Sequence, residues 1–567
     1  MTNIKEKVLK ELNKNEFPDL KFLYSKEVLD IVLDILDELL KIDKKEFEEL
    51  LSIPNEKLTF DSFEEDSLLD YFWSLLNHLK SVNSWEQIRN IIETFRPKIE
   101  DFWNYVAYNK DYFDKLKYVD ENLELDEEQK RIIYLRLKAF IDRWIDLEEK
   151  KQKRLKEINL ELSKLSDQFN NNIIDDEALF EYLVEDYELI KHLPKEILEQ
   201  AENKAKIKNK KWYLFDADPT VYQAIMKYCD SKKIRKEFEY YRHSVASKWK
   251  YDNRKIVLQL LELKKEKASL LWYNNYAEYS LNDKMANSPE QVVELIEWIS
   301  KKSKQKSDKE IEELKNYFWL DEFNSYDLAY YSRKYKEEKY SIDEKKLKEY
   351  FEFNNSLNYL FSFVENFYWI EMKKFEIDSY NEDILIYEVY KDWKQIAYYF
   401  LDPFYSKNKR SWAWADNLRD KSYLSNKLPI ILNVCNFQKT SWKITLYLRD
   451  VETIFHEFWH AIHEILSESK YQELSWFWVE WDFVELPSQI LENWVTDNES
   501  LSKIAKHKDN WEKLSKDILE KLEKLKTFMS WNFVIRQNEF ALVDMNIYLM
   551  EIPSTLEELD KNVLNFV

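Results

Sequence analysis

The sequence contains no glycine in 567 residues. At average usage a chain of this length would hold about 40 glycines. Tight turns and helix C-termini need residues with positive φ, where glycine is favoured because it lacks a Cβ atom. The same chain holds 21 tryptophans, and tryptophan is a bulky residue that is normally rare. Other residues must therefore occupy the positions that glycine takes in most folds.

The rest of the composition is that of a folded, soluble protein. Hydrophobic residues make up 45% of the chain, which is ample for a large core. The net charge of −22 argues against a nucleic-acid partner. Two cysteines, Cys229 and Cys435, are too few for a disulfide framework. The charged N-terminus lacks the apolar run of a signal peptide, and no apolar stretch could span a membrane, so we expect a cytoplasmic protein.

Apolar residues recur at helical spacing along much of the chain. Between 147 and 169 they form one stripe on an otherwise polar segment, at Leu155, Ile158, Leu162, Leu165 and Phe169. A second helix is predicted to start at Ser288, with Pro289 in its first position and Gln291 completing a capping box. The chain is therefore predicted to be mostly α-helical.

Strand signals are confined to about 383–448, where β-branched and aromatic runs flank Lys391-Asp392-Trp393-Lys394. A two-residue hairpin turn of type I′ needs positive φ at both central residues and normally carries Asp-Gly or Asn-Gly. Trp393 thus occupies a position that favours glycine. No linker or repeat marks a boundary, and we divide the chain into a helical N-terminal region, 1–215, and a catalytic region, 216–567.

The candidate chemistry is concentrated in 450–492. Seven histidines occur in the chain, and His456, His460 and His463 fall within eight residues. On a helix, residues four apart lie on one face, so His456 and His460 can present two imidazoles to one metal ion. Glu457 is then placed to accept a proton from water on that metal, as in H-E-x-x-H zinc sites.

The flanking residues support a helix at this motif. Asp450 is the predicted N-cap, and a helical apolar face follows at Val451, Ile454, Phe455, Phe458, Ile462 and Ile465. His463 is interpreted as a core or outer histidine rather than a fourth ligand, because a catalytic zinc keeps one position open for water.

A catalytic zinc needs a third protein ligand, and the next acidic segment offers several. Spacing alone leaves four carboxylates in competition, Glu480, Asp482, Glu485 and Glu492.

The segments HEFWHAIH and VEWDFVELPSQILENW resemble the thimet oligopeptidase family of zinc metallopeptidases, most closely its bacterial oligopeptidase A branch. Further similarity extends over LDPFYSKNKRSWAWADN, PIILNVCNF, KTFMSWNFVIRQNEFALVD and YNNYAEYSLNDKMANSPEQV. The resemblance implies one Zn²⁺ per chain, held by His456, His460 and Glu485, with Glu457 as general base. It makes Glu452 and Glu492 candidates for hydrogen bonds that orient the ligands.

The resemblance also implies a fold and a reaction. The fold would be a mostly helical, two-lobed clam with a deep channel and a small β-sheet beside the zinc helix. The reaction would be hydrolysis of internal peptide bonds in short oligopeptides by a metal-activated water. The alternative is a truncated, non-catalytic helical protein that retains the zinc site and binds peptides or acts as a scaffold. The oligomeric state is left open.

The chain departs from the family pattern in two ways. The family has glycine where this chain has Trp459, and the same replacement is inferred at Trp144, Trp249, Trp272, Trp393, Trp412, Trp442, Trp476, Trp478 and Trp531. Overpacking costs about 1–3 kcal/mol per site, and ten such sites would exceed the roughly 5–15 kcal/mol that stabilises a domain. We therefore hypothesise that the host reads UGA as glycine.

The second departure concerns the C-terminal end. After the point where this sequence stops, family members carry a glycine-rich loop with tyrosines and a histidine that donate hydrogen bonds to the developing oxyanion. The resemblance thus leads us to expect that the end of the catalytic region is missing from this sequence.

Overall fold

A computed structural model describes residues 2–142, 148–410, 412–439, 443–475 and 478–566. The chain divides into two compact units, and each unit is built from two separate stretches of sequence. The first unit contains 1–146 and 344–519, and the second contains 147–343 and 520–567. The division predicted at 215/216 falls inside the second unit, so the two predicted regions do not coincide with these units.

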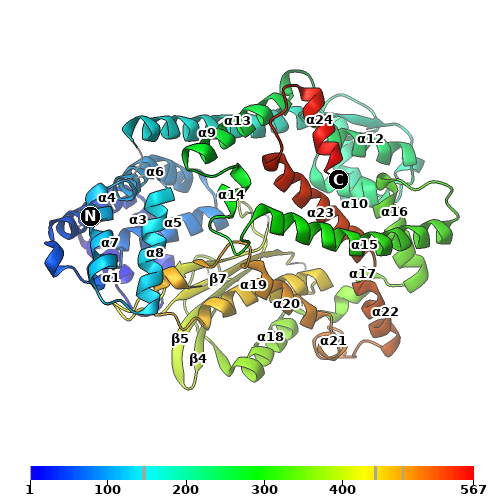
Figure 1. The fold of residues 1–567 in the computed structure, drawn as a ribbon. Helices are drawn as coiled ribbons and strands as arrows, with labels where there is room; N and C mark the ends of the chain where they lie inside the picture. The colour runs from blue at the N-terminus through cyan, green and yellow to red at the C-terminus, as the bar shows by residue number, and fades with distance from the viewer. Residues whose placement is uncertain (1, 143–147, 411, 440–442, 476–477, 567) are drawn as a thin grey trace. The chain divides into compact units, whose positions relative to one another are not determined.

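The first unit begins with a series of helices (Figure 1). The first six of them contribute to one apolar core, and the last two contribute to a second. These helices are α1 (Thr2–Leu12), α2 (Leu20–Leu23), α3 (Lys26–Leu29), α4 (Val32–Ser52), α5 (Leu68–Val82), α6 (Glu86–Ala107), α7 (Lys110–Asn122) and α8 (Glu127–Asp142). Its second stretch contributes α17 (Glu344–Leu347), α18 (Phe353–Tyr368), α19 (Leu448–Ile465), α20 (Glu485–Val495) and α21 (Asn498–Ile504).

A five-stranded sheet lies in the middle of this unit. Its strands are β3 (Ile370–Lys374), β4 (Leu385–Lys391), β5 (Lys394–Phe404), β6 (Trp414–Arg419) and β7 (Ile430–Phe437). The spatial order is β3-β4-β5-β7-β6, and the β5–β7 pair is parallel whereas the other neighbours are antiparallel. The neighbouring strands β5 and β7 are buried along nearly their whole length.

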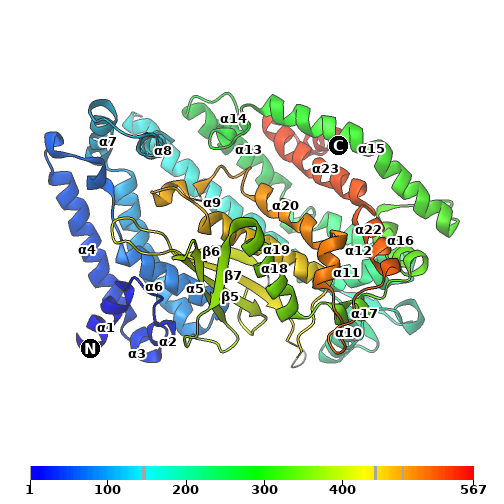
Figure 2. The ribbon, with the colours of Figure 1, turned by 90° about the horizontal axis from the view of Figure 1, so that it is seen from below.

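Helices cover both faces of this sheet (Figure 2). Successive strand residues point to opposite faces. Tyr398 and Phe400 of β5 belong to the core formed with the N-terminal helices. The intervening Tyr399 points the other way, and its ring centroid lies 5.0 Å from that of Phe458 on α19. The same alternation places Asn433 of β7 on the α19 face.

The predicted hairpin joins β4 and β5 through Asp392 and Trp393. Their φ angles are 51° and 65°, as a type I′ turn requires. Positive φ recurs at other tryptophans, namely Trp212, Trp249, Trp272, Trp319, Trp369 and Trp511. Of the other inferred glycine positions, Trp459 and Trp531 lie within helices, and Trp144, Trp442 and Trp476 lie outside the described residues.

Two local predictions need correction. Strands also occur before residue 383, at β1 (Tyr182–Val184), β2 (Tyr213–Phe215) and β3. These strands are short or only partly buried, so they lack the long apolar runs that marked β4 and β5. Asp450 is not the N-cap of the motif helix, since α19 begins one turn earlier and Tyr447 is its N-cap. Asp450 instead accepts a hydrogen bond from the Tyr447 backbone N–H at 2.9 Å.

The second unit is formed mainly by helices. They are α9 (Glu149–Glu177), α10 (Lys195–Ile207), α11 (Pro219–Tyr228), α12 (Lys232–Ser244), α13 (Arg254–Leu270), α14 (Tyr276–Leu281), α15 (Pro289–Phe318), α16 (Ser325–Tyr335), α23 (Ser530–Leu549) and α24 (Leu556–Asn565), with α22 (Lys516–Lys526) leading into the unit. As predicted, α9 carries the apolar stripe, and Ser288 caps α15 by accepting a hydrogen bond from the Gln291 N–H at 3.3 Å.

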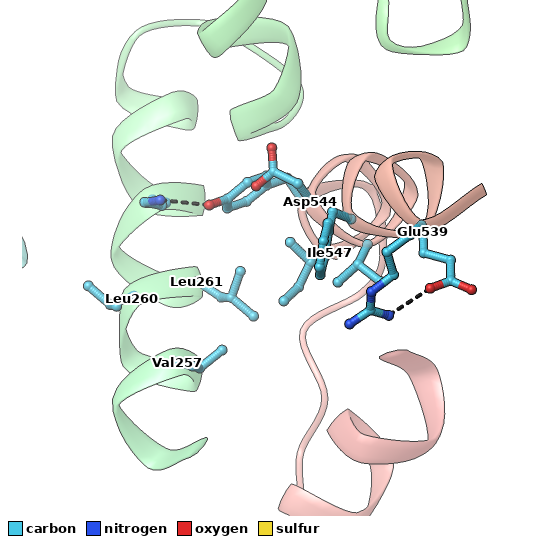
Figure 3. Close-up of a pocket in the computed structure, with 11 residues that line it drawn as sticks. Val257, Leu260, Leu261, Glu539, Asp544 and Ile547 are labelled. Atoms are coloured by element: carbon cyan, nitrogen blue, oxygen red, sulfur yellow. Dashed lines mark hydrogen bonds and ion pairs between the residues drawn. The ribbon is translucent and has the colours of Figure 1, made fainter. Parts of the chain in front are cut away.

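A cavity of about 430 Å³ lies between α13 and α23 of the second unit (Figure 3). Val257, Leu261 and Ile547 contribute apolar walls, and Lys264 donates a hydrogen bond to the Tyr548 hydroxyl at 2.7 Å. The lining contains no histidine or cysteine, so the cavity does not offer the metal donors that the sequence predicted.

The predicted fold class, a mostly α-helical chain with a small sheet beside the motif helix, is confirmed. The clam shape with a deep channel concerns how the two units are arranged, and it stays a prediction. Among the described residues, no helix combines the length and apolar composition that crossing a membrane requires.

Candidate metal centre

Helix α19 carries two histidines on one face. His456 and His460 are one turn apart, and their ring centroids lie 4.9 Å from each other. The opposite side of the helix is apolar and fully buried at Val451, Phe455 and Phe458. Packing of that side against the sheet and α18 therefore turns the two imidazoles away from the core.

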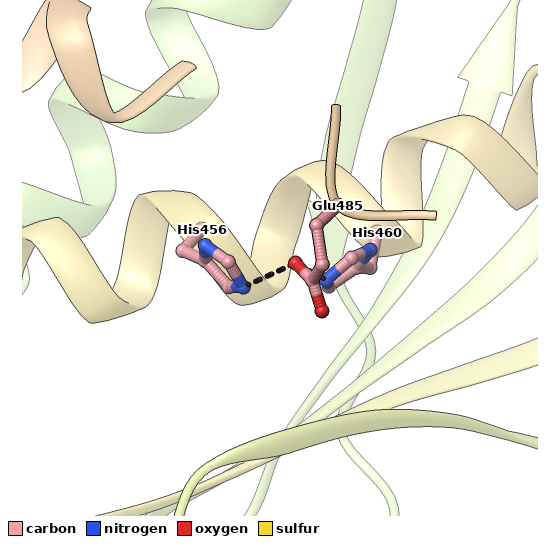
Figure 4. Close-up of side chains that lie close together, drawn as sticks. All are labelled: His456, His460 and Glu485. Atoms are coloured by element: carbon pink, nitrogen blue, oxygen red, sulfur yellow. Dashed lines mark ion pairs between the residues drawn. The ribbon is translucent and has the colours of Figure 1, made fainter. Parts of the chain in front are cut away.

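Glu485, the first residue of α20, approaches both imidazoles (Figure 4). Its Oε2 atom lies 3.2 Å from Nε2 of His456 and 3.3 Å from Nε2 of His460. One donor atom from each of the three residues falls within 4.8 Å of the others. Two imidazole nitrogens and one carboxylate oxygen are a donor set that suits zinc and other first-row divalent ions.

Two neighbours on α20 contact this group from outside. Glu492 lies 2.7 Å from His456 through Oε1 and Nδ1, on the side of the ring opposite to Glu485. The hydroxyl of Ser488, which is fully buried, donates to Oε2 of Glu485 at 2.8 Å. A proton held on Nδ1 by Glu492 leaves Nε2 of His456 with a free lone pair that points at Glu485.

Glu457 follows His456 and is buried on α19, with 8% of its surface exposed. Burial raises the pKa of its carboxyl to about 7, while His456 opposes this shift and Glu485 adds to it. Burial lowers the pKa of His460 to about 4, against the attraction of Glu485. The centre thus combines a neutral imidazole with a carboxyl group that exchanges its proton near neutrality.

Spacing had left four carboxylates open as the third donor, and the structure groups Glu485 with the two histidines. Glu480 is instead paired with Arg131 at 3.0 Å. Glu492 contacts His456 on its other nitrogen. Asp482 lies on the loop before α20. The third donor is determined by how α19 and α20 pack together. Spacing along the chain does not reveal this packing.

The remaining predicted residues lie on α19. Glu452 is partly buried one turn before His456, and His463 is partly buried one turn after His460. Burial lowers the pKa of His463. The rings of Trp459 and Tyr368 are tilted against each other with centroids 5.5 Å apart, and the buried indole N–H of Trp459 has no acceptor among the described residues. A buried donor without an acceptor is unfavourable, so the helix accommodates this indole poorly.

Sequence comparisons agree with the resemblance. Residues 225–566 match the model of Peptidase family M3, and 34–153 match the N-terminal domain of neurolysin and thimet oligopeptidase. Oligopeptidase A of Escherichia coli (strain K12) is 33% identical over 531 residues, covering 88% of this chain and 78% of that protein. Oligopeptidase A of Haemophilus influenzae is 31% identical over 538 residues, covering 90% and 79%.

The fold matches solved structures of peptidases. A structure of PZ peptidase A with an inhibitor superposes with a TM-score of 0.52 at 13% identity, covering 94% of this chain and 78% of that one. The solved structure shows the shared fold, and the sequence matches make this protein a peptidase. The chain belongs to peptidase family M3, and its resemblance to the oligopeptidase A branch is confirmed.

Proposed function

We propose that this chain is a zinc-dependent peptidase that hydrolyses internal bonds of short oligopeptides. His456, His460 and Glu485 would hold the ion, and Glu457 would be the general base. The observation that carries the proposal is the convergence of three donor atoms within 4.8 Å, with Glu457 adjacent on the same helix.

The donor set fits the proposed ion. Glu485 is hydrogen-bonded by Ser488 and His456 by Glu492, so two of the three donors are oriented by fixed partners. When bound, zinc polarises the scissile carbonyl and lowers the pKa of a water molecule. Cobalt or manganese would also suit these donors, and the choice of zinc rests on the family resemblance.

The chain's own residues would then move the protons. The Glu457 carboxylate takes a proton from the attacking water and passes it to the nitrogen of the leaving amine. Glu457 is 8% exposed, so its carboxyl is largely shielded from bulk solvent. Glu452 and His463 stay candidates for outer hydrogen bonds, and the cytoplasmic location stays a prediction.

The proposal is tested on the full chain by zinc content and by cleavage of a fluorescence-quenched peptide. Glu457→Gln should keep about one zinc per chain while turnover falls by about 10²–10⁴-fold. His460→Ala should lose both zinc and turnover. Turnover at the wild-type rate in Glu457→Gln, or a wild-type chain that binds no zinc, would contradict the proposal.

The substrate peptide should be blocked at both ends. Cleavage of a blocked peptide supports attack on internal bonds, whereas cleavage only of peptides with a free C-terminal carboxylate indicates release of dipeptides. Zinc and peptide binding without any cleavage would favour the alternative, a non-catalytic peptide-binding protein.

A further inference from the structure

A buried amide links the sheet to the helix of the candidate metal centre. Asn433 of β7 is 1% exposed. Its Nδ2 donates to the backbone carbonyl of Glu457 at 2.8 Å and to that of Leu432 at 3.2 Å. Its Oδ1 accepts a hydrogen bond from the Tyr399 hydroxyl of β5 at 2.8 Å. Two central strands are thus tied to one backbone atom of α19.

The position would ordinarily be apolar. Ile431, Leu432 and Val434 beside Asn433 are all buried, and burying an amide is unfavourable unless its hydrogen bonds are made. Within α19 the carbonyl of Glu457 also serves as an acceptor in the helical ladder. The helix therefore does not need the amide in order to satisfy that carbonyl, and the bond serves mainly to fix α19 on the sheet at Glu457.

We propose that Asn433, held by Tyr399, is a positioning residue for Glu457. It anchors the backbone of the base to β7 and limits sliding of α19 along the sheet, while Glu485 is supplied separately by α20. The Phe458 ring against Tyr399 covers the anchor. A displacement of about 1 Å at a reacting group can slow catalysis up to 10²-fold. This inference rests on the proposed function.

The test separates anchoring from stability with three variants, Asn433→Leu, Tyr399→Phe and the double variant. Asn433→Leu leaves the buried Tyr399 hydroxyl without its acceptor and should melt at a lower temperature. The double variant replaces both partners by apolar groups and should recover much of that loss. Its kcat should nevertheless stay about 10-fold low with KM and zinc content unchanged.

A readout independent of turnover is hydrogen exchange of the α19 backbone in the zinc-loaded protein. The double variant should exchange several-fold faster in a peptide covering α19, with other helices unchanged. Cys435→Ala, at a buried position on the same face of β7, is the matched control and should change neither kcat nor α19 exchange. Cys435 is 1% exposed.

The outcomes distinguish this inference from the proposed function. Wild-type kcat and α19 exchange in the double variant would overturn the role of Asn433. Exchange that rises only in proportion to a general loss of stability would also overturn it. Wild-type turnover in Glu457→Gln would instead overturn the proposed function, and α19 exchange would still decide whether Asn433 anchors the helix.

A second inference rests on the backbone angles of the tryptophans. Fourteen described residues have positive φ, and seven of them are tryptophan, with φ from 56° to 78°. Trp319 and Trp369 are left-handed C-caps of α15 and α18, where glycine is the usual residue. Trp249, Trp319 and Trp393 are each 92% exposed, so their rings gain little from packing.

Other tryptophans behave differently. Trp73 on α5 is 7% exposed, and its ring centroid lies 5.6 Å from that of Phe95 in the core. A bulky residue at positive φ is an outlier, and random substitution would not select left-handed positions. Trp73 thus has the core packing expected of tryptophan, whereas the seven left-handed tryptophans have a glycine-like backbone.

We infer that the protein made in its native host carries glycine at the seven left-handed positions, inserted at UGA codons, and tryptophan at Trp73. The test is the set of codons together with peptide masses of the native protein. UGA and glycine masses at Trp319, Trp369 and Trp393, with UGG and an indole mass at Trp73, are expected. UGG codons or indole masses at the left-handed positions would overturn the inference.

Discussion

Each left-handed tryptophan places a Cβ atom against its own backbone and exposes an indole ring to water. A residue other than glycine in this conformation costs about 1 kcal/mol. We expect Trp319→Gly and Trp369→Gly each to raise the free energy of unfolding by about that amount, measured by urea denaturation. Trp73→Gly is the control and should lower it by about 3–5 kcal/mol, because it opens a cavity in the core. Destabilisation by Trp319→Gly would show that its ring packs favourably.

Glu492 is the outer partner with the most direct geometry, because it lies 2.7 Å from Nδ1 of His456. Loss of such a partner typically weakens metal binding by about 10–100-fold. Glu492→Ala should therefore lower zinc affinity at least about 10-fold in a chelator competition. Glu499→Ala, which removes an exposed carboxylate paired with Lys503 on α21, is the control. Equal zinc affinities for the two variants would show that Glu492 does not support metal binding.

At the residue scale, spacing along the sequence was sufficient to predict the two candidate donors that share one helix. The i, i+4 relation of His456 and His460 follows from helix geometry alone. Glu485 comes from a second helix, so its place depends on packing that spacing does not encode, and the family resemblance was needed to select it. Asn433 and Ser488 gave no local signal, because a single polar residue acquires a partner only when distant segments meet.

At the scale of elements, α12 and α16 of the second unit are joined by a buried ion pair. Arg235 and Asp327 are each 2% exposed and lie 2.7 Å apart. Asp327→Asn would leave the guanidinium buried without its counter-charge, and it should lower the free energy of unfolding by about 3–5 kcal/mol. Glu177→Gln breaks the more exposed pair with Arg242 and should cost less than about 1 kcal/mol. Thermal unfolding measures both variants, and similar losses of stability in Asp327→Asn and Glu177→Gln would contradict the expected difference.

Elements were predictable where a local rule determined them. The start of α15 and the β4–β5 turn were both located from short patterns, a capping residue with proline and a two-residue loop. The edge strand β3 was missed, because a partly exposed strand without an apolar run resembles a loop. The start of α19 was placed late, because Asp450 was predicted to be the N-cap, whereas it caps the helix from the third helical position.

At the scale of the whole molecule, the sequence indicated abundant helix and one small sheet. It did not reveal that each compact unit contains two stretches of sequence, separated by residues 147–343 in the first unit and by residues 344–519 in the second. Boundaries of this kind lack a linker signal, since the chain leaves one unit and returns to it. The helical content follows from local periodicity, whereas the assignment of segments to units depends on contacts between segments that are distant in sequence.

Stability of the first unit should depend on pH through a buried carboxyl on α4. Asp43 is 6% exposed and accepts a hydrogen bond from Ser67 at 2.7 Å. Burial raises its pKa to about 6, partly offset by Ser67 and reinforced by Asp70 and Glu46. The folded state binds this proton more tightly than the unfolded chain does. The carboxyl therefore does not lower the free energy of unfolding below about pH 4, and it lowers it increasingly as pH rises from there through 6.

Asp43→Asn removes this titration and keeps an acceptor for Ser67. The variant should therefore match the wild type near pH 4 and exceed its free energy of unfolding by on the order of 2 kcal/mol at pH 8. Urea denaturation at several pH values measures the difference, and Asp34→Asn, at an exposed position on the same helix, should give a nearly constant difference. A gap between Asp43→Asn and wild type that shrinks as pH rises would show that the Asp43 carboxylate is stabilised in the fold, and that its pKa is lowered.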